Sequence, residues 1–407
     1  MPGQYKGFLG NTGGDTGLSV YVHVPFCISK CPYCDFASVA GGQAPEKKYV
    51  ECLLNELRGV VRHEGLKDKM VASVYFGGGT PTLFSPDSFS RLLGGIGRLF
   101  SVLRHAEITI EANPDTIDLK RLKAFKDAGI NRLSLGIQSL DNDALKTLGR
   151  THDAEKTIEA FLSARDAGFA NIGVDLIFGV PGQGLDAWGH TLSGVLNLKP
   201  EHVSTYGLTF EKGTPFHRAL TQGAFENRPQ EDEEARMFLT ARGMLKDSNY
   251  NHYEISNFSL SGRECLHNLR CWLGLDYVGV GVGAHSYFSG RPGWGRRCWN
   301  FRDIGQYMTG IERQGLARDA QEGLTKEESM IEAMMLGLRM PGHGINAGDF
   351  ALRFGLSPEY AFREMDALCQ DGLLVKNSGS ILLTERGILI SDEIFARLAV
   401  GLNAHAH

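Results

Sequence analysis

Six short runs of β-branched and apolar residues alternate with longer helical patterns in this 407-residue chain. Near-continuous apolar strands separated by helices are typical of a parallel sheet that is buried on both faces. Six such units predict an α/β fold with a partial (β/α)6 barrel, whose chemistry belongs at the carboxyl ends of the strands. The expected strands span 18–24, 71–77, 106–113, 132–139, 171–180 and 202–210, and helices between them include 49–63, 118–129 and 154–168.

The rest of the chain divides into three further segments. Residues 1–17 are rich in glycine and lack the apolar core of a signal peptide, so we expect a flexible N-terminal tail before a barrel at 18–250. Residues 251–325 are rich in Cys, His, Trp and Gly and read as an irregular cap followed by a linker. Residues 326–407 give a helix–turn–helix–hairpin pattern, which predicts a winged-helix-like α+β domain.

Charge and composition narrow the class of protein. The net charge of −5 offers no basic field for nucleic acid, and residues 349–407 carry five Lys or Arg against eight Asp or Glu. No apolar run approaches the roughly 20 residues of a membrane span. Eight unevenly placed cysteines without a secretory signal favour reduced, metal-binding thiols. We therefore expect a cytoplasmic protein that neither binds nucleic acid nor crosses a membrane.

Three cysteines follow the first expected strand with C-x3-C-x2-C spacing: Cys27, Cys31 and Cys34. Structural zinc almost always takes four ligands, c-type heme attachment needs a histidine where Asp35 stands, and a thioredoxin-like pair leaves Cys27 unexplained. Iron–sulfur clusters are held by thiolates. Three thiolates can hold three irons of a [4Fe–4S] cluster and leave the fourth iron open for the amino and carboxylate groups of a small ligand.

Polar and glycine residues gather at the ends of the next four expected strands. The second strand ends in the run Gly77-Gly78-Gly79-Thr80-Pro81-Thr82, which lacks the Lys-Ser/Thr of a phosphate-binding loop. Glu111 and Asn113 end the third strand, Gln138 ends the fourth, and Asp175 lies within the fifth. Because the carboxyl ends of parallel strands meet at one rim, these groups predict a single site there.

Six stretches carry a resemblance to a known family. In order they read "YVHVPFCISKCPYCDF", "YFGGGTPT", "EITIEANPDT", "RLSLGIQSLDNDALKTLGRTH", "VDLIFGVPGQ" and "HVSTYGLTFEKGTP". Together, across roughly 18–290, they resemble the oxygen-independent coproporphyrinogen III oxidase-like family of the radical S-adenosylmethionine (SAM) superfamily. The chain is most similar to the HemW-type heme chaperone branch, and its C-terminal segment resembles that of the family as well.

The resemblance implies roles for particular residues. Cys27, Cys31 and Cys34 would ligate a [4Fe–4S] cluster, which an electron donor such as a flavodoxin or ferredoxin would reduce for cleavage of SAM to methionine and a 5′-deoxyadenosyl radical. The SAM site would comprise Tyr21 and Tyr33 as lining residues, the backbone of Gly78, Gly79 and Thr80 at the methionyl end, Glu111, Gln138 and Asp175 for the amino group and ribose, and Arg150 for the carboxylate.

Two local differences separate the branches. The oxidase has a further cysteine two positions after the third, where this chain has Phe36. The chaperone branch has an H-N-x-x-Y-W motif implicated in heme binding, which reads His267-Asn268-Leu269-Arg270-Cys271-Trp272 here. The resemblance thus implies His267 and Cys271 as heme-binding residues, since imidazole and thiolate both ligate heme iron. His285, in a glycine-rich turn, is a candidate for lining the same site.

The function expected from these features is a radical-SAM heme chaperone that carries heme as cargo and passes it to acceptor proteins. One alternative is a coproporphyrinogen III oxidase, against which Phe36 speaks; another is a methyltransferase or cyclopropane-forming enzyme on the same scaffold. Slow SAM cleavage is expected. Turnover of coproporphyrinogen III is not expected, because Phe36 replaces the fourth cysteine. Cys265, His267 and Cys271 present no full local ligand set for a second metal.

Overall fold

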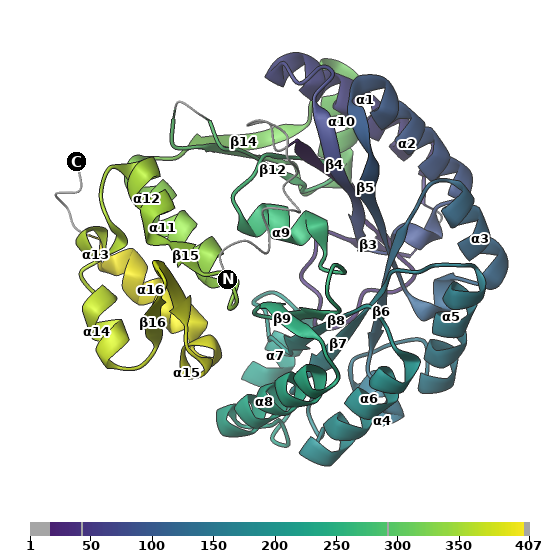
Figure 1. The fold of residues 1–407 in the computed structure, drawn as a ribbon. Helices are drawn as coiled ribbons and strands as arrows, with labels where there is room; N and C mark the ends of the chain where they lie inside the picture. Colours follow the sequence, from purple (N-terminus) through teal and green to yellow (C-terminus); the bar gives the residue numbers. More distant parts are fainter. Residues whose placement is uncertain (1–16, 42–43, 291–292, 403–407) are drawn as a thin grey trace.

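A computed structural model describes residues 17–41, 44–290 and 293–402, so most of the expected N-terminal tail lies outside the described residues. Six parallel strands curve into a partial barrel with helices on the outside (Figure 1). The barrel strands are β1 (Leu18–Val24), β4 (Met70–Gly78), β5 (Ser101–Ala112), β6 (Arg132–Gln138), β7 (Ile172–Phe178) and β8 (His202–Gly207). The helices of this region are α1 (Glu46–Glu64), α2 (Pro86–Leu99), α3 (Leu119–Asp127), α4 (Asn142–Thr147), α5 (Ala154–Asp166), α6 (Leu185–Leu198), α7 (Pro215–Thr221) and α8 (Glu231–Asp247). The predicted partial (β/α)6 barrel is confirmed.

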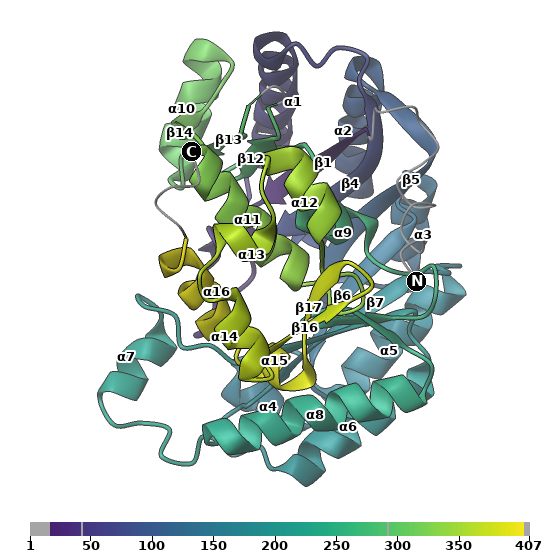
Figure 2. The same ribbon diagram turned by 60° about the vertical axis from the view of Figure 1, so that its left-hand side comes forward.

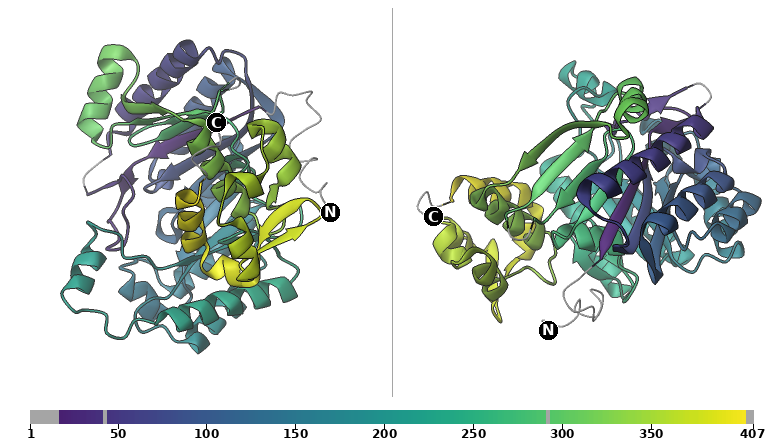
Figure 3. Two further views of the ribbon diagram at one scale, coloured as in Figure 1. Left: turned by 90° about the vertical axis from the view of Figure 1, so that its left-hand side faces the viewer. Right: turned by 90° about the horizontal axis from the view of Figure 1, so that it is seen from above.

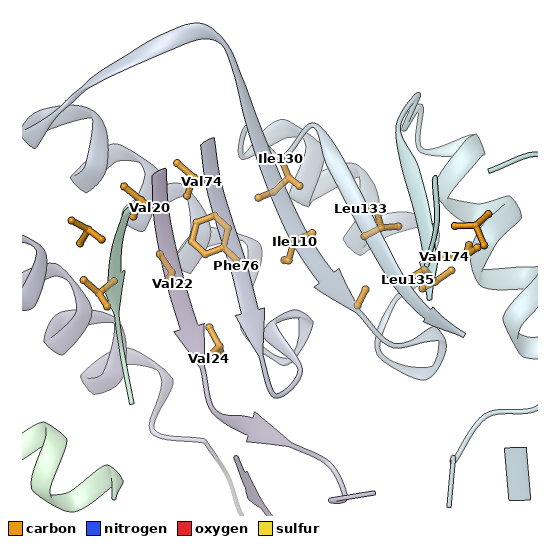
Figure 4. Packing of buried hydrophobic residues seen from close by; sticks show 14 of the residues in the cluster. Val20, Val22, Val24, Val74, Phe76, Ile110, Ile130, Leu133, Leu135 and Val174 are labelled. Carbon is orange, nitrogen blue, oxygen red and sulfur yellow. The ribbon is translucent and has the colours of Figure 1, made fainter. Parts of the chain in front are cut away.

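Side chains alternate between the two faces of the barrel strands, as the period of a β-strand requires. Apolar residues such as Val20, Val22 and Phe76 point outward to the helices and form the core (Figure 4). The opposite, concave face carries polar side chains, including Ser19 and Ser73. The expectation of strands apolar on both faces is therefore wrong for the inner face, where polar groups pair with one another.

The sheet extends beyond the barrel on both edges, which the sequence did not predict. β9 (Asn251–Glu254) and β10 (Asn257–Ser259) continue it past β8. On the other edge, β11 (Tyr277–Val280) pairs in parallel with β1, and β12 (His285–Phe288), β13 (Arg296–Asn300) and β14 (Arg318–Gly323) follow as antiparallel strands. Residues expected to form an irregular cap and linker thus build regular strands, with α10 (Ile304–Gln314) packed on α1.

Helix α9 (Leu266–Trp272) lies inside the curve of the sheet, between the barrel and the C-terminal elements (Figure 1). It contacts β4 on one side and the first C-terminal helix, α11 (Lys326–Leu338), on the other. Trp272 at its end lies under the Arg339 guanidinium, whose carbon is 4.6 Å from the indole ring. This helix therefore joins the two parts of the molecule.

The C-terminal elements confirm the winged-helix-like prediction. A three-stranded sheet in the order β15-β17-β16 combines one strand before the helices with a hairpin after them (Figures 2 and 3). The elements after α11 are β15 (Ile345–Asn346), α12 (Ala347–Phe354), α13 (Pro358–Ala361), α14 (Met365–Gln370), β16 (Leu374–Asn377), β17 (Ser380–Leu383), α15 (Glu385–Leu389) and α16 (Ser391–Val400). Within the described residues, no helix has the length and apolar character that a membrane crossing requires.

Candidate cofactor site and family

The three cysteines lie in a loop at the open rim of the barrel, directly after β1. Short strands β2 (Phe26–Cys27) and β3 (Val39–Ala40) pair in parallel and close the loop at its base. The Cys34 amide donates to the Cys31 carbonyl at 3.1 Å, which makes a tight turn between the last two thiols. All three thiols are free and partly exposed. Partial burial raises the pKa of Cys27 and Cys34.

A glycine at the end of β4 allows the backbone to approach this loop closely. The Gly79 amide donates to the Val24 carbonyl at 2.8 Å, and the next amide, of Thr80, donates to the Phe26 carbonyl at 2.8 Å. A Cβ atom on Gly79 would lie 2.6 Å from the Phe26 carbonyl oxygen and 3.0 Å from the Cys27 sulfur. Only glycine fits here, so the predicted glycine turn and the cysteine loop form one site.

Arg150 brings a positive charge to the cysteine loop. Its guanidinium donates from Nη1 to the Cys31 sulfur at 3.4 Å, and from Nη2 to Asn113 Oδ1 at 2.6 Å and the Gly136 carbonyl at 2.9 Å. Asn113 in turn donates to Thr80 Oγ1 at 3.0 Å. This planar cation is held at the rim by the cysteine loop, the residue after β5 and strand β6, where it is suited to a carboxylate.

Glu111 lies next to the glycine turn on the concave face. Its carboxylate accepts from Tyr75 Oη at 2.9 Å and from the Gly78 amide at 3.0 Å. Desolvation inside the barrel, opposed by the Tyr75 hydrogen bond, raises the pKa of Glu111 to about 7, with the charge of Asp175 adding to the rise. A cationic ligand beside Glu111 would favour its ionised form and offset the cost of desolvation by electrostatic attraction.

Asp175 and Gln138 lie on the neighbouring strands of the same rim. Ser134 Oγ donates to Asp175 Oδ2 at 3.2 Å, and burial raises the pKa of this carboxyl group. Gln138 has φ of +64°, a left-handed conformation that is uncommon outside glycine, at the point where β6 ends. A Cβ atom on Gly136 would lie 2.9 Å from Gln138 Nε2, so the side-chain amide needs the glycine two residues before it on β6.

The two predicted lining tyrosines occupy different places. Tyr21 is on the concave face of β1, where its hydroxyl donates to His23 Nδ1 at 3.0 Å. His23 Nε2 then donates to the Ala37 carbonyl at 2.8 Å and ties the strand to the far end of the cysteine loop. Tyr33 is within that loop and its ring packs against Phe216, with centroids 6.1 Å apart.

Sequence reasoning missed several polar residues of the concave face. His23 is buried beneath Gly78, and Arg132 is buried with its Nε 3.8 Å from Glu107. Each alternates with an apolar residue along its strand, as Ser19, Tyr21 and His23 alternate with valines in β1. That period of two is the available signal, and it contradicts the expectation of uniformly apolar strands.

The site fits the groups that the sequence predicts. Three thiols, a glycine cradle and an arginine converge at one rim, and Glu111 and Asp175 supply carboxylates nearby. Among the described residues, no three Cys, His, Asp or Glu side chains surround a point as ligands of a single ion would. An iron–sulfur cluster needs a different arrangement of ligands. Each thiolate binds a separate iron, so the three sulfurs lie farther apart than the ligands of a single ion.

The predicted heme residues lie elsewhere, on α9. His267 is buried against the concave face near the start of β4. Its Nδ1 is 3.1 Å from Ser73 Oγ, and its ring centroid is 5.1 Å from that of Tyr75. The amide of His267 donates to Glu107 at 3.1 Å, so the barrel holds both the ring and the helix start. Burial raises the pKa of the partly exposed Cys271 to about 12, which keeps it a neutral thiol.

Comparison with curated proteins decides the family. The Radical SAM superfamily model matches residues 21–193, and the HemN C-terminal domain model matches 324–390. The chain is 35% identical to heme chaperone HemW of Bacillus subtilis (strain 168), over 93% of this chain and 98% of that protein. The chain belongs to the HemW heme chaperone family. As a HemW-family and radical SAM protein, it is expected to use a [4Fe–4S] cluster and SAM as cofactors.

Other curated and solved proteins are similar to the chain over nearly its whole length. Heme chaperone HemW of Escherichia coli (strain K12) is 32% identical over 93% of this chain and 97% of that protein. A mouse mitochondrial protein named radical S-adenosyl methionine domain-containing protein 1 is 37% identical over 94% of this chain and 87% of its own length. Coproporphyrinogen III oxidase HemN from Escherichia coli shares the fold, with a TM-score of 0.81 at 24% identity over 94% of this chain and 90% of HemN.

Proposed function

We propose that this HemW-family protein binds heme and transfers it to acceptor proteins, while its cysteine loop carries a [4Fe–4S] cluster that binds SAM. The observation that carries the proposal is near full-length similarity to proteins named heme chaperones, at 35% identity to the Bacillus subtilis protein. Phe36 supports it, since the oxidase-type fourth cysteine is absent from this position. Heme as cargo, the acceptor proteins and a cytoplasmic location are parts of this proposal.

The rim residues have distinct parts in the proposed cofactor chemistry. Cys27, Cys31 and Cys34 would hold the cluster, which supplies one electron for reductive cleavage of SAM when it is reduced by a donor such as a flavodoxin or ferredoxin. Arg150, fixed by Asn113, would orient the SAM carboxylate. The backbone of Gly78, Gly79 and Thr80 would border the methionyl end, and Glu111, Gln138 and Asp175 would take the amino group and ribose, with Tyr21 and Tyr33 alongside.

The prediction that His267 and Cys271 ligate heme stays a prediction, and it carries a structural condition. In this conformation the His267 ring is inside the barrel and hydrogen-bonded near Ser73. For that ring to reach iron, α9 must leave the barrel and give up its Glu107 cap. Such a movement would leave Glu107 and Arg132 without the helix that covers them.

Coproporphyrinogen III oxidation is the second candidate function, favoured by the shared fold with HemN. The two functions separate in one pair of assays on cluster-loaded protein kept free of oxygen. A heme chaperone should bind heme at near-stoichiometric levels and convert little coproporphyrinogen III to protoporphyrinogen IX. Rapid porphyrinogen turnover combined with weak heme binding would contradict the proposal and establish the oxidase.

A further inference from the structure

The sheet of the barrel extends from β1 onto β11 and β12. Tyr21 of β1 pairs with Gly279 of β11, and Tyr277 of β11 pairs with Tyr287 of β12. Paired residues point to the same side of a sheet, as do residues two apart on one strand. His285 is two residues before Tyr287, so it faces the same side as Tyr21 and the proposed SAM site.

His285 has the accessibility that His267 lacks. Its side chain is exposed, at the start of β12. It pairs across the strands with Trp299 of β13, and the two rings stack with centroids 5.8 Å apart and planes 25° apart. Desolvation, together with the charges of Arg302 and Arg297, lowers the pKa of His285, so the imidazole is neutral at pH 7 and able to ligate iron.

The cysteine loop packs directly against the turn that precedes His285. A Cβ atom on Gly283 would lie 3.0 Å from Ala37 Cβ, and Arg302 Nη2 donates to the Asp35 carbonyl at 3.1 Å. Phe36, between these two contacts, is 59% exposed. An exposed aromatic ring and an exposed guanidinium thus lie at the border between the cysteine loop and His285.

Helix α11 covers the other end of the face formed by β12 and β13. Arg297, two residues before Trp299, has ion pairs to Glu322 at 3.2 Å and to Glu332 of α11 at 3.4 Å. The C-terminal elements therefore cover one end of the β12–β13 face and leave the His285 end open. The turn itself is held from behind, where the Gly281 amide donates to the buried carboxylate of Glu56 at 2.8 Å.

We propose that His285 is the iron ligand of the heme that this protein carries, with the macrocycle against Trp299 and Phe36 and a propionate on Arg302. The inference rests on the proposed heme-carrier function and gives its cargo a site. Each part of the heme finds matching chemistry: an imidazole for iron, aromatic rings for the flat apolar ring system, and a planar cation for a carboxylate. Bound there, heme would lie beside the cysteine loop.

The test is an anaerobic heme titration of the cluster-loaded full chain, followed by its Soret absorbance. His285→Ala should weaken heme binding by at least about tenfold and shift the Soret band, and added imidazole should restore the wild-type spectrum. His267→Ala is measured in parallel. His63→Ala is the matched control, because this histidine is also exposed, at 55%, but lies at the end of α1. It should leave both affinity and spectrum unchanged.

The outcomes separate this site from the function on which it rests. If wild type binds heme tightly and His285→Ala binds it equally well, the site is wrong and the carrier function stands. If neither wild type nor His285→Ala binds heme, both proposals are wrong. Loss of binding in His267→Ala alone would return the ligand to α9 and overturn the assignment to His285.

The propionate contact has its own test. Wild type should bind heme more tightly than heme dimethyl ester, whose propionates carry no charge. Arg302→Ala should bind heme about tenfold more weakly, the ester equally well, and thus lose this preference. An unchanged preference in Arg302→Ala would remove the arginine from the site.

Discussion

Glu111 is a buried carboxylate with a shifted pKa in the proposed SAM site. It bonds to Tyr75 and to the Gly78 amide, which places its charge at the end of β4. Its pKa is raised to about 7, mainly by desolvation. The protonation state of Glu111 therefore changes within the pH range in which the protein can be studied.

SAM binding should follow this titration. The carboxylate form disappears as pH falls through 7, and with it the attraction for the SAM ammonium. We expect the SAM Kd of cluster-loaded protein to rise about eightfold between pH 7.5 and pH 6, measured by calorimetry. Glu111→Gln should bind SAM more weakly and with no pH dependence in this range. A flat wild-type profile would remove Glu111 from the ammonium site.

Gly79 tests the closeness of the glycine turn and the cysteine loop. In Gly79→Ala the added Cβ would lie 2.6 Å from the Phe26 carbonyl oxygen, so one of the two segments must shift. We expect the variant to lose most of its cluster, measured as iron per chain and as absorbance after reconstitution. Gly243→Ala is the control, because no atom lies within 4 Å of its added Cβ; a normal iron content in Gly79→Ala would contradict the cradle.

At this scale the sequence predicted residues with strong local signals and missed those that depend on strand facing. The cysteine spacing and the glycine run lead to one rim, where a Gly79 Cβ would meet Cys27. His23 and Arg132 carry no motif, and their importance appears only when the sheet brings His23 under Gly78 and Arg132 beside Glu107. The burial of His267 was equally unpredictable, since it depends on the packing of α9.

The position of helix α9 decides whether the residues of the H-N-x-x-Y-W motif, at 267–272, are accessible to heme. The carboxylate of Glu107 caps its first amides, those of Leu266 and His267, at 3.0 and 3.1 Å. Arg270 anchors the other side of the helix to Ser19, with 2.8 Å between Nε and Oγ. Two anchors inside the barrel make a seven-residue helix part of the core.

His267→Ala should therefore destabilise the heme-free protein. It removes a buried ring packed on Tyr75 and the hydrogen bond to Ser73, so we expect the free energy of unfolding to fall by about 2–3 kcal/mol. Urea denaturation of the apo chain measures this change, with His63→Ala as the exposed control. An unchanged midpoint would show that α9 is not held in the barrel in solution.

Glu56 links α1 to the turn before His285. Its carboxylate accepts from the Gly281 amide and from Tyr307 of α10 at 2.6 Å, and Asn300 donates to its other oxygen. Burial, only partly offset by these bonds, raises the pKa of Glu56 from its ordinary 4.5 to about 7. The folded state therefore retains this proton at pH values where the unfolded chain has lost it.

Glu56 makes the stability of the folded protein depend on pH. Its contribution to the free energy of unfolding is complete below pH 4.5 and is lost as pH rises through 7, by about 3 kcal/mol in all. Glu56→Gln should abolish that part of the decline in the free energy of unfolding between pH 5 and 8. Parallel declines in wild type and variant would show that Glu56 is not the titrating group.

Elements were predictable where the sequence pattern is long and repeated. β1 was predicted at its observed bounds, and the other five barrel strands were found with errors of one to five residues at their ends, the largest at the start of β5. The strands β11–β14 were missed because they are short and are stabilised by pairing with β1 and with one another rather than by local propensity. Their omission also hid the face on which His285 and Trp299 lie.

At the scale of the whole molecule, one curved sheet carries two neighbouring proposed sites. The rim of the barrel presents three thiols, a glycine turn and Arg150, and the same concave face continues to His285 on β12. Helix α9 and the C-terminal elements lie at the open side of the curved sheet (Figure 1). This arrangement places the proposed cargo beside the proposed cofactor and leaves it open to an acceptor.

Heme transfer is the measurement that tests this account most directly. Cluster-loaded protein carrying one equivalent of heme is mixed, without oxygen, with apomyoglobin as a probe acceptor, and the Soret band of the product is followed. The account predicts tight initial binding to wild type, complete transfer to the acceptor, and almost no conversion of coproporphyrinogen III in a parallel assay. Absent heme binding, or efficient porphyrinogen turnover by the same preparation, would contradict it.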